Sequence, residues 1–412
     1  MIIESIAKQL RLDEFIALLC LRWNHSRHRR APLADSADMS DEEFCFAALA
    51  RTSRSFAIVI GALGPELRIA VGVYYLLLRA LDTVEDDSDC GDEKRRLRLL
   101  GDFHRLIEDS EFVINGFGSE DERFLCENLD KVLRVFHKLP RAYRMVIKQT
   151  AEEMGSGMIK FSNVVHVESI AQYNEYTHYV AGILGEGLTK LFILSGSENR
   201  FQIGDYKSTS NSMGLFLQKT NIIRDFKEDL EEGRNWWPKE IWGGHFDRLE
   251  EFAKKPGSTE SLKCLNEMVC DAIAHFPDCS EYLSKLSDRK VFRFCAIPQI
   301  MALSTLELMY SNSEVFEKSV KLRRGYTAKV FTKLLSYDDF QEIAVVCCNK
   351  LLAKMKWSRL GEDRAHVKKV ESAIRRLEKL VSGWKNINTK SSWSFLDVAE
   401  MGALALFLIW KL

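Results

Sequence analysis

Two short acidic segments carry residues whose types and spacing suit the chemistry of a phosphorylated substrate. Asp82 and Asp86 lie in DTVED, and Asp225 and Asp229 lie in DFKED. In a helix, residues four apart share a face, with their Cβ atoms about 5–6 Å apart. Mg²⁺ binds a few carboxylate oxygens together with waters and substrate phosphate oxygens. We therefore hypothesise that two facing helices hold Mg²⁺ around one diphosphate, whose departure the metal assists by neutralising its charge.

The alternative is that both segments are solvated acidic faces, which a chain with 59 acidic residues forms easily by chance. Two observations favour the metal–diphosphate hypothesis. Each motif lies beside an arginine, Arg79 or Arg224. Each motif also continues a polar stripe on an otherwise apolar helix: Tyr75, Arg79, Asp82 and Asp86 in the first, and Gln218, Asn221, Asp225 and Asp229 in the second. Positions with this spacing usually point at the core of a bundle, so polar residues there need an explanation.

The elements that must position these residues are predicted to be helices. Only 7 prolines occur in 412 residues, where average usage would give roughly 20, and proline interrupts helices. No segment alternates convincingly as a strand would. We expect an all-α protein with a single bundle of about a dozen helices over residues 42–385, preceded by a helical lead-in over residues 1–41. Residues 66–81 are apolar on nearly all sides and should be surrounded by other helices, and a second helix should span 211–231.

Charge and cysteine content exclude two other classes of protein. The chain has 58 basic and 59 acidic residues, a net charge of -1. Because nucleic-acid-binding proteins are strongly basic, we expect no nucleic-acid partner. The ten cysteines include no CxxC pair and no cluster with zinc-ligand spacing. We therefore expect buried free thiols in a reducing compartment.

The C-terminal segment, residues 386–412, is a polar spacer followed by an apolar stretch that is uninterrupted from Met401 to Trp410. A bilayer-spanning helix needs about 20 apolar residues, so the stretch is short. A last helix docked on the domain is the alternative. Trp393, Trp410 and Lys411 flank the stretch, and aromatic and basic flanks suit a membrane interface. We expect a short or partial membrane anchor.

Longer segments around both motifs resemble the squalene synthase family of head-to-head isoprenoid synthases, to which phytoene synthase and dehydrosqualene synthase also belong. The two aspartate-rich signatures are YYLLLRALDTVEDD (74–87) and QKTNIIRDFKEDL (218–230). Further matches are TSRSFA (52–57), HYVAGILGEGLTKLF (178–192), GRNWWP (233–238), FRFCAIPQIMAL (292–303) and VKLRRG (320–325). The resemblance covers roughly residues 42–330 and implies a helical bundle of the isoprenoid-synthase type.

The resemblance implies a two-step reaction of two farnesyl diphosphate molecules. The first step forms presqualene diphosphate, a cyclopropane; the second ionises and rearranges it and reduces it to squalene, a sterol precursor, with hydride from NADPH. By matching position, the ligands of Mg²⁺ would be Asp82, Glu85, Asp86, Asp225 and Asp229. The resemblance further implies that Tyr179 removes the proton in the first step. Without the resemblance to the family, Tyr179 would be interpreted as a core tyrosine beside Tyr173 and Tyr176.

The resemblance also implies binding residues. Substrate phosphates would be bound by Ser53, Arg54, Tyr75, Arg79, Gln218, Arg224 and Arg234. NADPH would be bound by Arg54, Arg79, Asn221, Arg224, Lys321 and Arg323. No GxGxxG fingerprint is present, so the nucleotide would bind without a Rossmann domain. The apolar pocket of the second step would be lined by Phe56, Phe292, Phe294, Cys295, Pro298 and Gln299.

Three glycines in HYVAGILGEGLTKLF each disfavour a helix by about 1 kcal/mol relative to alanine. They are Gly182, Gly185 and Gly187. Close approach of a prenyl chain or of another helix would explain them.

Three other functions compete with this interpretation. A sister enzyme that stops at a dehydro product is disfavoured by VKLRRG and by the apolar tail, which resemble the NADPH-using branch. A catalytically inactive relative acting as an interaction protein usually lacks motif carboxylates, and both motifs are intact here. A membrane-associated scaffold would leave the polar stripes unexplained. We expect an enzyme anchored by its tail in the endoplasmic reticulum membrane, with the catalytic domain facing the cytosol.

Overall fold

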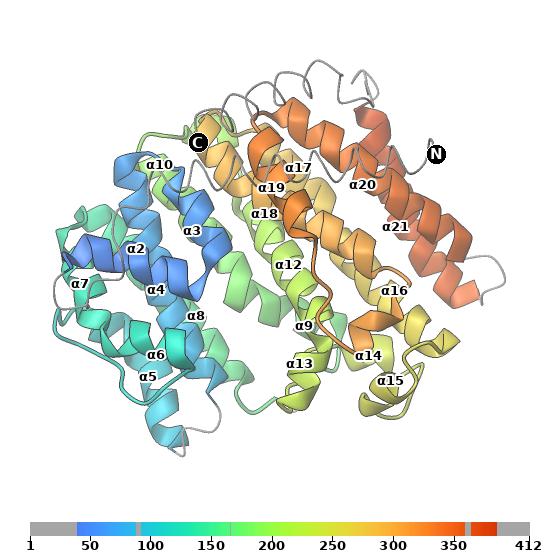
Figure 1. Cartoon of the computed structure of the whole chain (residues 1–412), viewed down its shortest axis with the longest axis horizontal. Helices are drawn as coiled ribbons and strands as arrows, with labels where there is room; N and C mark the ends of the chain where they lie inside the picture. Colours follow the sequence, from blue (N-terminus) through green and yellow to red (C-terminus); the bar gives the residue numbers. More distant parts are fainter. Residues whose placement is uncertain (1–38, 88–91, 165, 359–363, 385–412) are drawn as a thin grey trace, which may run out of the picture.

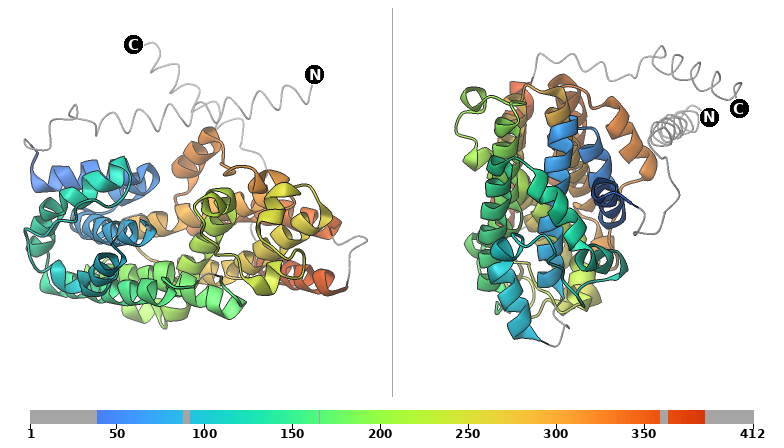
Figure 2. Two further views of the ribbon diagram at one scale, coloured as in Figure 1. Left: turned by 90° about the horizontal axis from the view of Figure 1, so that it is seen from below. Right: turned by 90° about the vertical axis from the view of Figure 1, so that its left-hand side faces the viewer.

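The computed structural model describes residues 39–87, 92–164, 166–358 and 364–384, and within these ranges every regular element is a helix. The prediction of an all-α protein is therefore confirmed for the described residues. In Figure 1 the N-terminal helices gather on one side, α12 and α18 run through the middle, and α20 and α21 cover the far side. The left view of Figure 2 again places the blue N-terminal helices on one side of the molecule and the red C-terminal helices on the other.

Most helices are joined by short connections, and a longer one over residues 107–119 joins α5 to α6. The N-terminal part comprises α2 (Asp41–Thr52), α3 (Arg54–Gly61), α4 (Pro65–Asp86), α5 (Glu93–Leu106), α6 (Glu120–Glu127), α7 (Leu129–Lys138) and α8 (Arg141–Phe161). The middle part comprises α9 (Ile170–Thr177), the π-helical turn η1 (His178–Gly182), α10 (Ile183–Leu194), α11 (Arg200–Ile203), α12 (Lys207–Arg224), α13 (Phe226–Glu231) and α14 (Lys239–Trp242). The C-terminal part comprises α15 (Glu250–Lys254), α16 (Thr259–Ile273), α17 (Phe276–Ser284), α18 (Arg289–Met309), the 3-10 turn η2 (Ser313–Phe316), α19 (Arg324–Lys333), α20 (Tyr337–Ser358) and α21 (Arg364–Gly383).

The apolar helix predicted over 66–81 is the central helix α4. It begins with Pro65 at its first position, where a fixed φ and a missing N–H cost nothing. It contacts α2, α3, α5, α6, α7, α8 and α10, which accounts for its apolar residues on nearly every side. The helix continues into its acidic extension and ends at Asp86, so the first motif occupies its last turns.

The predicted continuous helix over 211–231 was wrong at one residue. The helix α12 ends at Arg224, and α13 begins at Phe226. Asp225 lies between them with φ -96° and ψ 13°. The Arg224 guanidinium and the Ser319 hydroxyl both donate hydrogen bonds to its carboxylate, and the Ser319 contact is a tertiary one that helical periodicity does not encode.

The three glycines are explained by neighbouring side chains and backbone rather than by a prenyl chain. A Cβ atom on Gly185 would lie 2.3 Å from the Ser210 carbonyl oxygen of α12. One on Gly182 would meet the Asn211 side chain, and one on Gly187 would meet the Tyr74 hydroxyl. The helices η1 and α10 therefore pack closely against α12, the helix that carries the second polar stripe.

We expect Gly185→Ala to lower the free energy of unfolding by about 1–3 kcal/mol, the usual effect of overpacking an interior. The added methyl group would meet backbone, which cannot rotate away, and this outweighs the ~1 kcal/mol that alanine gains in helix propensity. Chemical denaturation measures the change. Gly61→Ala is the matched control, because a Cβ atom there would meet nothing within 4 Å. Equal stability of the two variants would contradict the close packing of α10 on α12.

Among the described helices, α18 alone is long and apolar enough to span a membrane, but 72% of its most apolar window is buried inside the protein. It is therefore a core helix. The predicted tail at 386–412 and residues 1–38 of the predicted lead-in lie outside the described residues. The eight cysteines in the described ranges are buried thiols outside any disulfide, as expected.

Candidate active site

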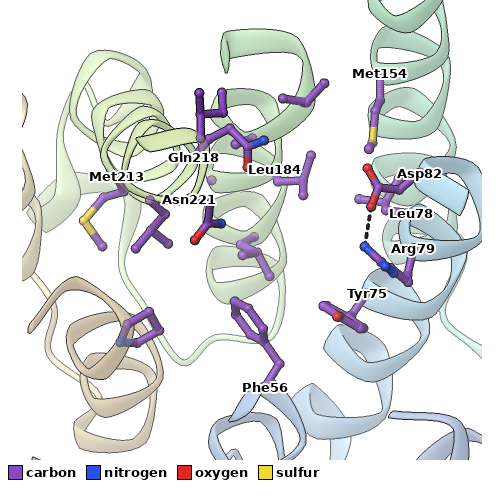
Figure 3. A pocket seen from close by; sticks show the side chains of 18 of the residues that line it. Phe56, Tyr75, Leu78, Arg79, Asp82, Met154, Leu184, Met213, Gln218 and Asn221 are labelled. Carbon is purple, nitrogen blue, oxygen red and sulfur yellow. Dashed lines mark hydrogen bonds and ion pairs between the residues drawn. The ribbon is translucent and has the colours of Figure 1, made fainter. Parts of the chain in front are cut away.

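A cavity of about 600 Å³ lies between α4, α12 and α18. Figure 3 shows side chains of α4 and α12 facing one another across it. On both helices the lining changes along the chain: the earlier lining residues are mostly apolar, such as Leu78 and Leu217, and the acidic motifs follow at the helix ends. The cavity therefore has one strongly charged end, and most of its remaining wall is apolar.

The first motif places its carboxylates at an unfavourable position of α4. The last turn of the helix contains no basic residue, and a helix C-terminus carries partial negative charge that repels carboxylates. Arg79 offsets part of this repulsion, because it pairs with Asp82 at 2.5 Å and with Glu122 of α6. Burial raises the pKa of Glu85 and outweighs Arg234 and Arg96, which lower it.

The second motif faces the first across the charged end of the cavity. The Arg224 guanidinium binds Asp225 through two hydrogen bonds of 2.8 and 2.5 Å. Arg234 binds Asp229 at 2.9 Å and approaches Asp86 of the first motif at 3.7 Å. Arg234 thus interacts with one carboxylate of each motif, which shows that both motifs belong to the same site.

Burial and mutual repulsion disfavour the ionised carboxyl groups. Burial, followed by repulsion from Asp86 and Asp82, holds the pKa of Glu85 well above its usual value. Burial and repulsion from Asp82 raise the pKa of Asp86 to about 7. Burial raises the pKa of Asp229 to about 6, although Arg234 opposes the shift. A site with this excess of negative charge is one that a cation would stabilise.

The donor set fits Mg²⁺ bound together with a substrate. Within the described ranges, no three metal-binding side chains come close enough together to enclose an ion by themselves. Mg²⁺ does not need such an enclosure, since it retains waters and uses one or two carboxylates plus phosphate oxygens. All five predicted ligands line the cavity: Asp82, Glu85, Asp86, Asp225 and Asp229. They are hard oxygen donors placed on both sides of a space open to a diphosphate.

The tyrosine predicted to be catalytic is not among the residues that line the cavity. The Tyr179 ring packs against Gly157 of α8, where a Cβ atom would lie 2.3 Å from the ring. Its neighbours Val180 and Ala181 do line the cavity. Tyr176, one turn earlier, lines it as well, and its ring stacks on Trp236 at 3.8 Å with an interplanar angle of 7°. Tyr179, Val180 and Ala181 all lie in the π-helical turn η1, and of these three Val180 and Ala181 line the cavity.

The predicted phosphate- and nucleotide-binding residues are only partly brought together. Those that line the cavity are Tyr75, Arg79, Gln218, Asn221, Arg224 and Arg234. Ser53 instead caps α3 by accepting a hydrogen bond from the Phe56 amide at 3.3 Å. Arg54 begins α3, and its side chain lies outside what the structure describes.

Lys321 and Arg323 lie in the segment between η2 and α19 and are exposed. They are not part of the cavity wall. In the same segment, the Ser319 hydroxyl donates a hydrogen bond of 3.2 Å to Asp225. This contact brings the segment beside the second motif, so a ligand could touch both.

Five of the six predicted apolar-pocket residues line the cavity. Four of them lie on α18, in the segment FRFCAIPQIMAL: Phe294, Cys295, Pro298 and Gln299. Phe56 of α3 lines it too, with its ring 5.4 Å from that of Tyr75. The expectation for Phe292 needs correction. Its ring packs edge-on against Tyr337 at 6.4 Å, because it lies on the face of α18 that is turned away from the cavity.

Several residues of the site were not predicted. Glu122 pairs with Arg79, Ser319 with Asp225, and Tyr176 stacks on Trp236. Glu122 lies in the acidic first turn of α6 and forms a capping box with Ser119, a pattern that indicates a helix start and not a partner for Arg79. Ser319 lies outside regular elements, between η2 and α19, and no pattern indicates it. Trp236 lies inside GRNWWP, a matched segment, and that position was the one available signal.

Comparison with known proteins agrees with this geometry. Residues 49–326 match the squalene/phytoene synthase family. Squalene synthase 1 of Arabidopsis thaliana is 46% identical over 299 residues, which are 72% of this chain and 72% of that protein. Squalene synthase 2 of Panax ginseng is 44% identical over 330 residues, 79% of this chain and 77% of that protein.

Solved structures show the same fold. The structure of TcSQS in complex with the ligand BPH1237 has a TM-score of 0.78 and 40% identity, over 84% of this chain and 99% of that one. A dehydrosqualene synthase structure with 18% identity and a TM-score of 0.51 shares the fold alone. Since the family match spans more than half of the sequence and relatives of this similarity cover more than two thirds of it, this chain belongs to the squalene/phytoene synthase family.

Proposed function

We propose that this chain is a squalene synthase that joins two farnesyl diphosphates and reduces the product with NADPH in a Mg²⁺-dependent reaction. The observation that supports this most directly is the cavity with two facing acidic motifs at one end and a largely apolar wall beyond them. Two prenyl diphosphates need such a division, because their phosphates require cations and their chains require an apolar wall.

In the first half-reaction, two farnesyl diphosphates give presqualene diphosphate, one pyrophosphate and one proton. Bound Mg²⁺ would supply the positive charge that stabilises the departing pyrophosphate. Arg79, Arg224 and Arg234 line the same end of the cavity. Each now pairs with a carboxylate, and the planar guanidinium group can bind phosphate in the same bidentate way. The carboxylates hold these arginines in place until the substrate arrives.

In the second half-reaction, presqualene diphosphate loses its pyrophosphate, rearranges and accepts hydride from NADPH to give squalene. The chain contributes an apolar wall that excludes water from the carbocation, and aromatic rings can stabilise positive charge without attacking it. Phe294 and Tyr282 belong to this wall. We propose that Asn221, Lys321 and Arg323 bind NADPH. Asn221 lines the cavity, and the Ser319–Asp225 contact brings the segment of Lys321 and Arg323 beside the second motif.

We propose, from the position of Tyr179 in the matched segment HYVAGILGEGLTKLF, that its hydroxyl removes the proton of the first half-reaction. Tyr179→Phe should then lower the rate of that half-reaction about 10²-fold, the lower range for loss of a general acid–base group. Formation of presqualene diphosphate without NADPH measures this step alone. Tyr176→Phe is the matched comparison, because Tyr176 lines the cavity and Tyr179 packs against Gly157. Full activity of Tyr179→Phe together with a slow Tyr176→Phe would transfer the role to Tyr176.

A product assay tests the proposed function. Purified protein is incubated with farnesyl diphosphate and Mg²⁺, with and without NADPH, and the products are identified by mass spectrometry. Squalene with NADPH and presqualene diphosphate without it are the expected results. Dehydrosqualene regardless of NADPH would place the chain in the sister branch, and no turnover by folded protein would support an inactive relative.

We also propose that residues 393–412 attach the catalytic domain, residues 42–385, to the endoplasmic reticulum membrane from the cytosolic side. The apolar stretch from Met401 to Trp410 and its aromatic flanks support this. Deleting residues 393–412 is expected to move the protein from the membrane pellet to the supernatant without abolishing turnover. A truncated protein that still pellets would contradict the anchor.

A further inference from the structure

A second hollow, of about 350 Å³, lies between α3, α18 and α19. We call it the side groove. Its main apolar and small residues come from all three helices: Val59 and Ala62 on or just after α3, Phe294 and Ile297 on α18, and Phe331 and Thr332 on α19. At Leu335, which is 37% exposed, the groove reaches the protein surface.

The side groove and the catalytic cavity lie on opposite sides of the contact between α3 and α18. On α3, Phe56 and Ile60 share the face that lines the cavity, whereas Val59 and Ala62 line the groove. Phe294 of α18 lines both spaces. Its ring packs edge-on against Phe192, 5.9 Å away, at the apolar part of the cavity. One aromatic side chain therefore forms part of both walls.

The polar side chains of the groove are directed to the backbone of α19. The Arg293 guanidinium donates hydrogen bonds to the carbonyls of Leu334 at 3.0 Å and Phe331 at 2.8 Å. The Thr332 hydroxyl donates to the carbonyls of Ala328 and Lys329. These bonds leave mostly apolar surface facing the groove, which suits a ligand without polar groups.

A hydrocarbon product has no favourable route past the charged end of the cavity. That end carries the six carboxylates of the two motifs, Glu232 and three arginines, and it is where diphosphates are expected to bind. Exposing apolar surface to water costs about 25 cal/mol per Å², so leaving by that end is unfavourable for a long hydrocarbon. The side groove offers apolar surface that begins at Phe294, which also lines the apolar part of the cavity.

We propose that the side groove is the exit route of the hydrocarbon product, which passes between α3 and α18 beside Phe294. The inference rests on the proposed function only in requiring that the product be a long hydrocarbon. It applies equally to squalene and to a dehydro product, and it names an apolar binding site distinct from the site of reaction.

The test fills the groove from two sides without altering any residue that lines the cavity. The variants are Thr332→Phe on α19 and Ala62→Phe just after α3. Ala62 is exposed, so a larger side chain there does not enter the core. Thr332→Val is the matched control, because it removes the hydroxyl without adding bulk. Hydrocarbon formation is followed in a single turnover after acid quench, and in steady state with phosphatidylcholine vesicles as acceptor.

Both filling variants are expected to form the hydrocarbon in a single turnover at the wild-type rate. Their steady-state rate should be lower by about fivefold or more, because product release becomes rate-limiting. A burst of one product per enzyme should therefore precede the steady state. Wild-type steady-state rates without a burst would overturn the proposal. So would an equal loss of single-turnover and steady-state rates, since the groove would then only support the cavity. Failure of the proposed function itself is distinguishable, because wild-type protein would then form no hydrocarbon.

Discussion

Asp225→Asn is expected to lower turnover by about 10³-fold, at the upper end of the effect of removing one group that stabilises developing charge. The substitution keeps the size of the side chain but removes the charge that would hold Mg²⁺ against the departing pyrophosphate. It also removes the partner of Arg224, which is bound through two hydrogen bonds. The loss should appear in both half-reactions, since each releases pyrophosphate from the same end of the cavity. Rates of presqualene diphosphate formation without NADPH, and of hydrocarbon formation with it, measure the two effects.

The matched control for this variant is Asp130→Asn. Asp130 is 23% exposed and pairs with Arg134, which is 33% exposed. Asp225 is also 23% exposed, and its partner Arg224 is 34% exposed. Each substitution therefore removes a comparable half-buried ion pair, and both should lower the free energy of unfolding by no more than about 1 kcal/mol. Equal turnover of the two variants would contradict a metal–diphosphate role for Asp225.

Lys219→Met is expected to lower the free energy of unfolding by about 3–5 kcal/mol, the effect of removing one partner of a buried ion pair. The Lys219 side chain is fully buried, and its ammonium group lies 2.6 Å from Asp271 of α16. Burial lowers the pKa of Lys219, although Asp271 opposes the shift. The same ammonium group lies 4.9 Å from the centre of the Tyr173 ring on α9. One charge thus joins three helices around the residues of α12 that line the cavity.

The cost of Lys219→Met should come mainly from the charge left behind on Asp271. The double variant Lys219→Met with Asp271→Leu is therefore expected to recover a large part of the lost stability. Lys227→Met is the control, because Lys227 is 31% exposed and pairs with Glu231, 63% exposed, four residues later. Such a pair is worth about 0.3–0.5 kcal/mol. Urea denaturation measures all three. A Lys219→Met protein that is no less stable than Lys227→Met would contradict the structural role of the buried pair.

The apolar helix, the polar stripes and the all-α class were predictable because they depend on neighbours along one helix. Spacing of four places Asp82 beside Asp86 on any helix, so the motif indicates paired carboxylates before any tertiary structure is known. The scarcity of proline indicates long helices for a similarly local reason, because proline disrupts the helix in which it lies. The glycines of HYVAGILGEGLTKLF were equally informative, since glycine inside a helix favours close approach by a neighbour.

The sequence by itself therefore determined the helical class, the two carboxylate pairs and the need for close packing near Gly185. Only the tertiary structure decided that Arg234 lies between Asp229 and Asp86, that Tyr176 rather than Tyr179 lines the cavity, and that Phe292 faces Tyr337. The physical reason is that periodicity specifies which residues share a face of one helix. Which face meets which neighbour, and how a π-helical turn rotates the side chains that follow it, depends on packing between segments far apart in the chain.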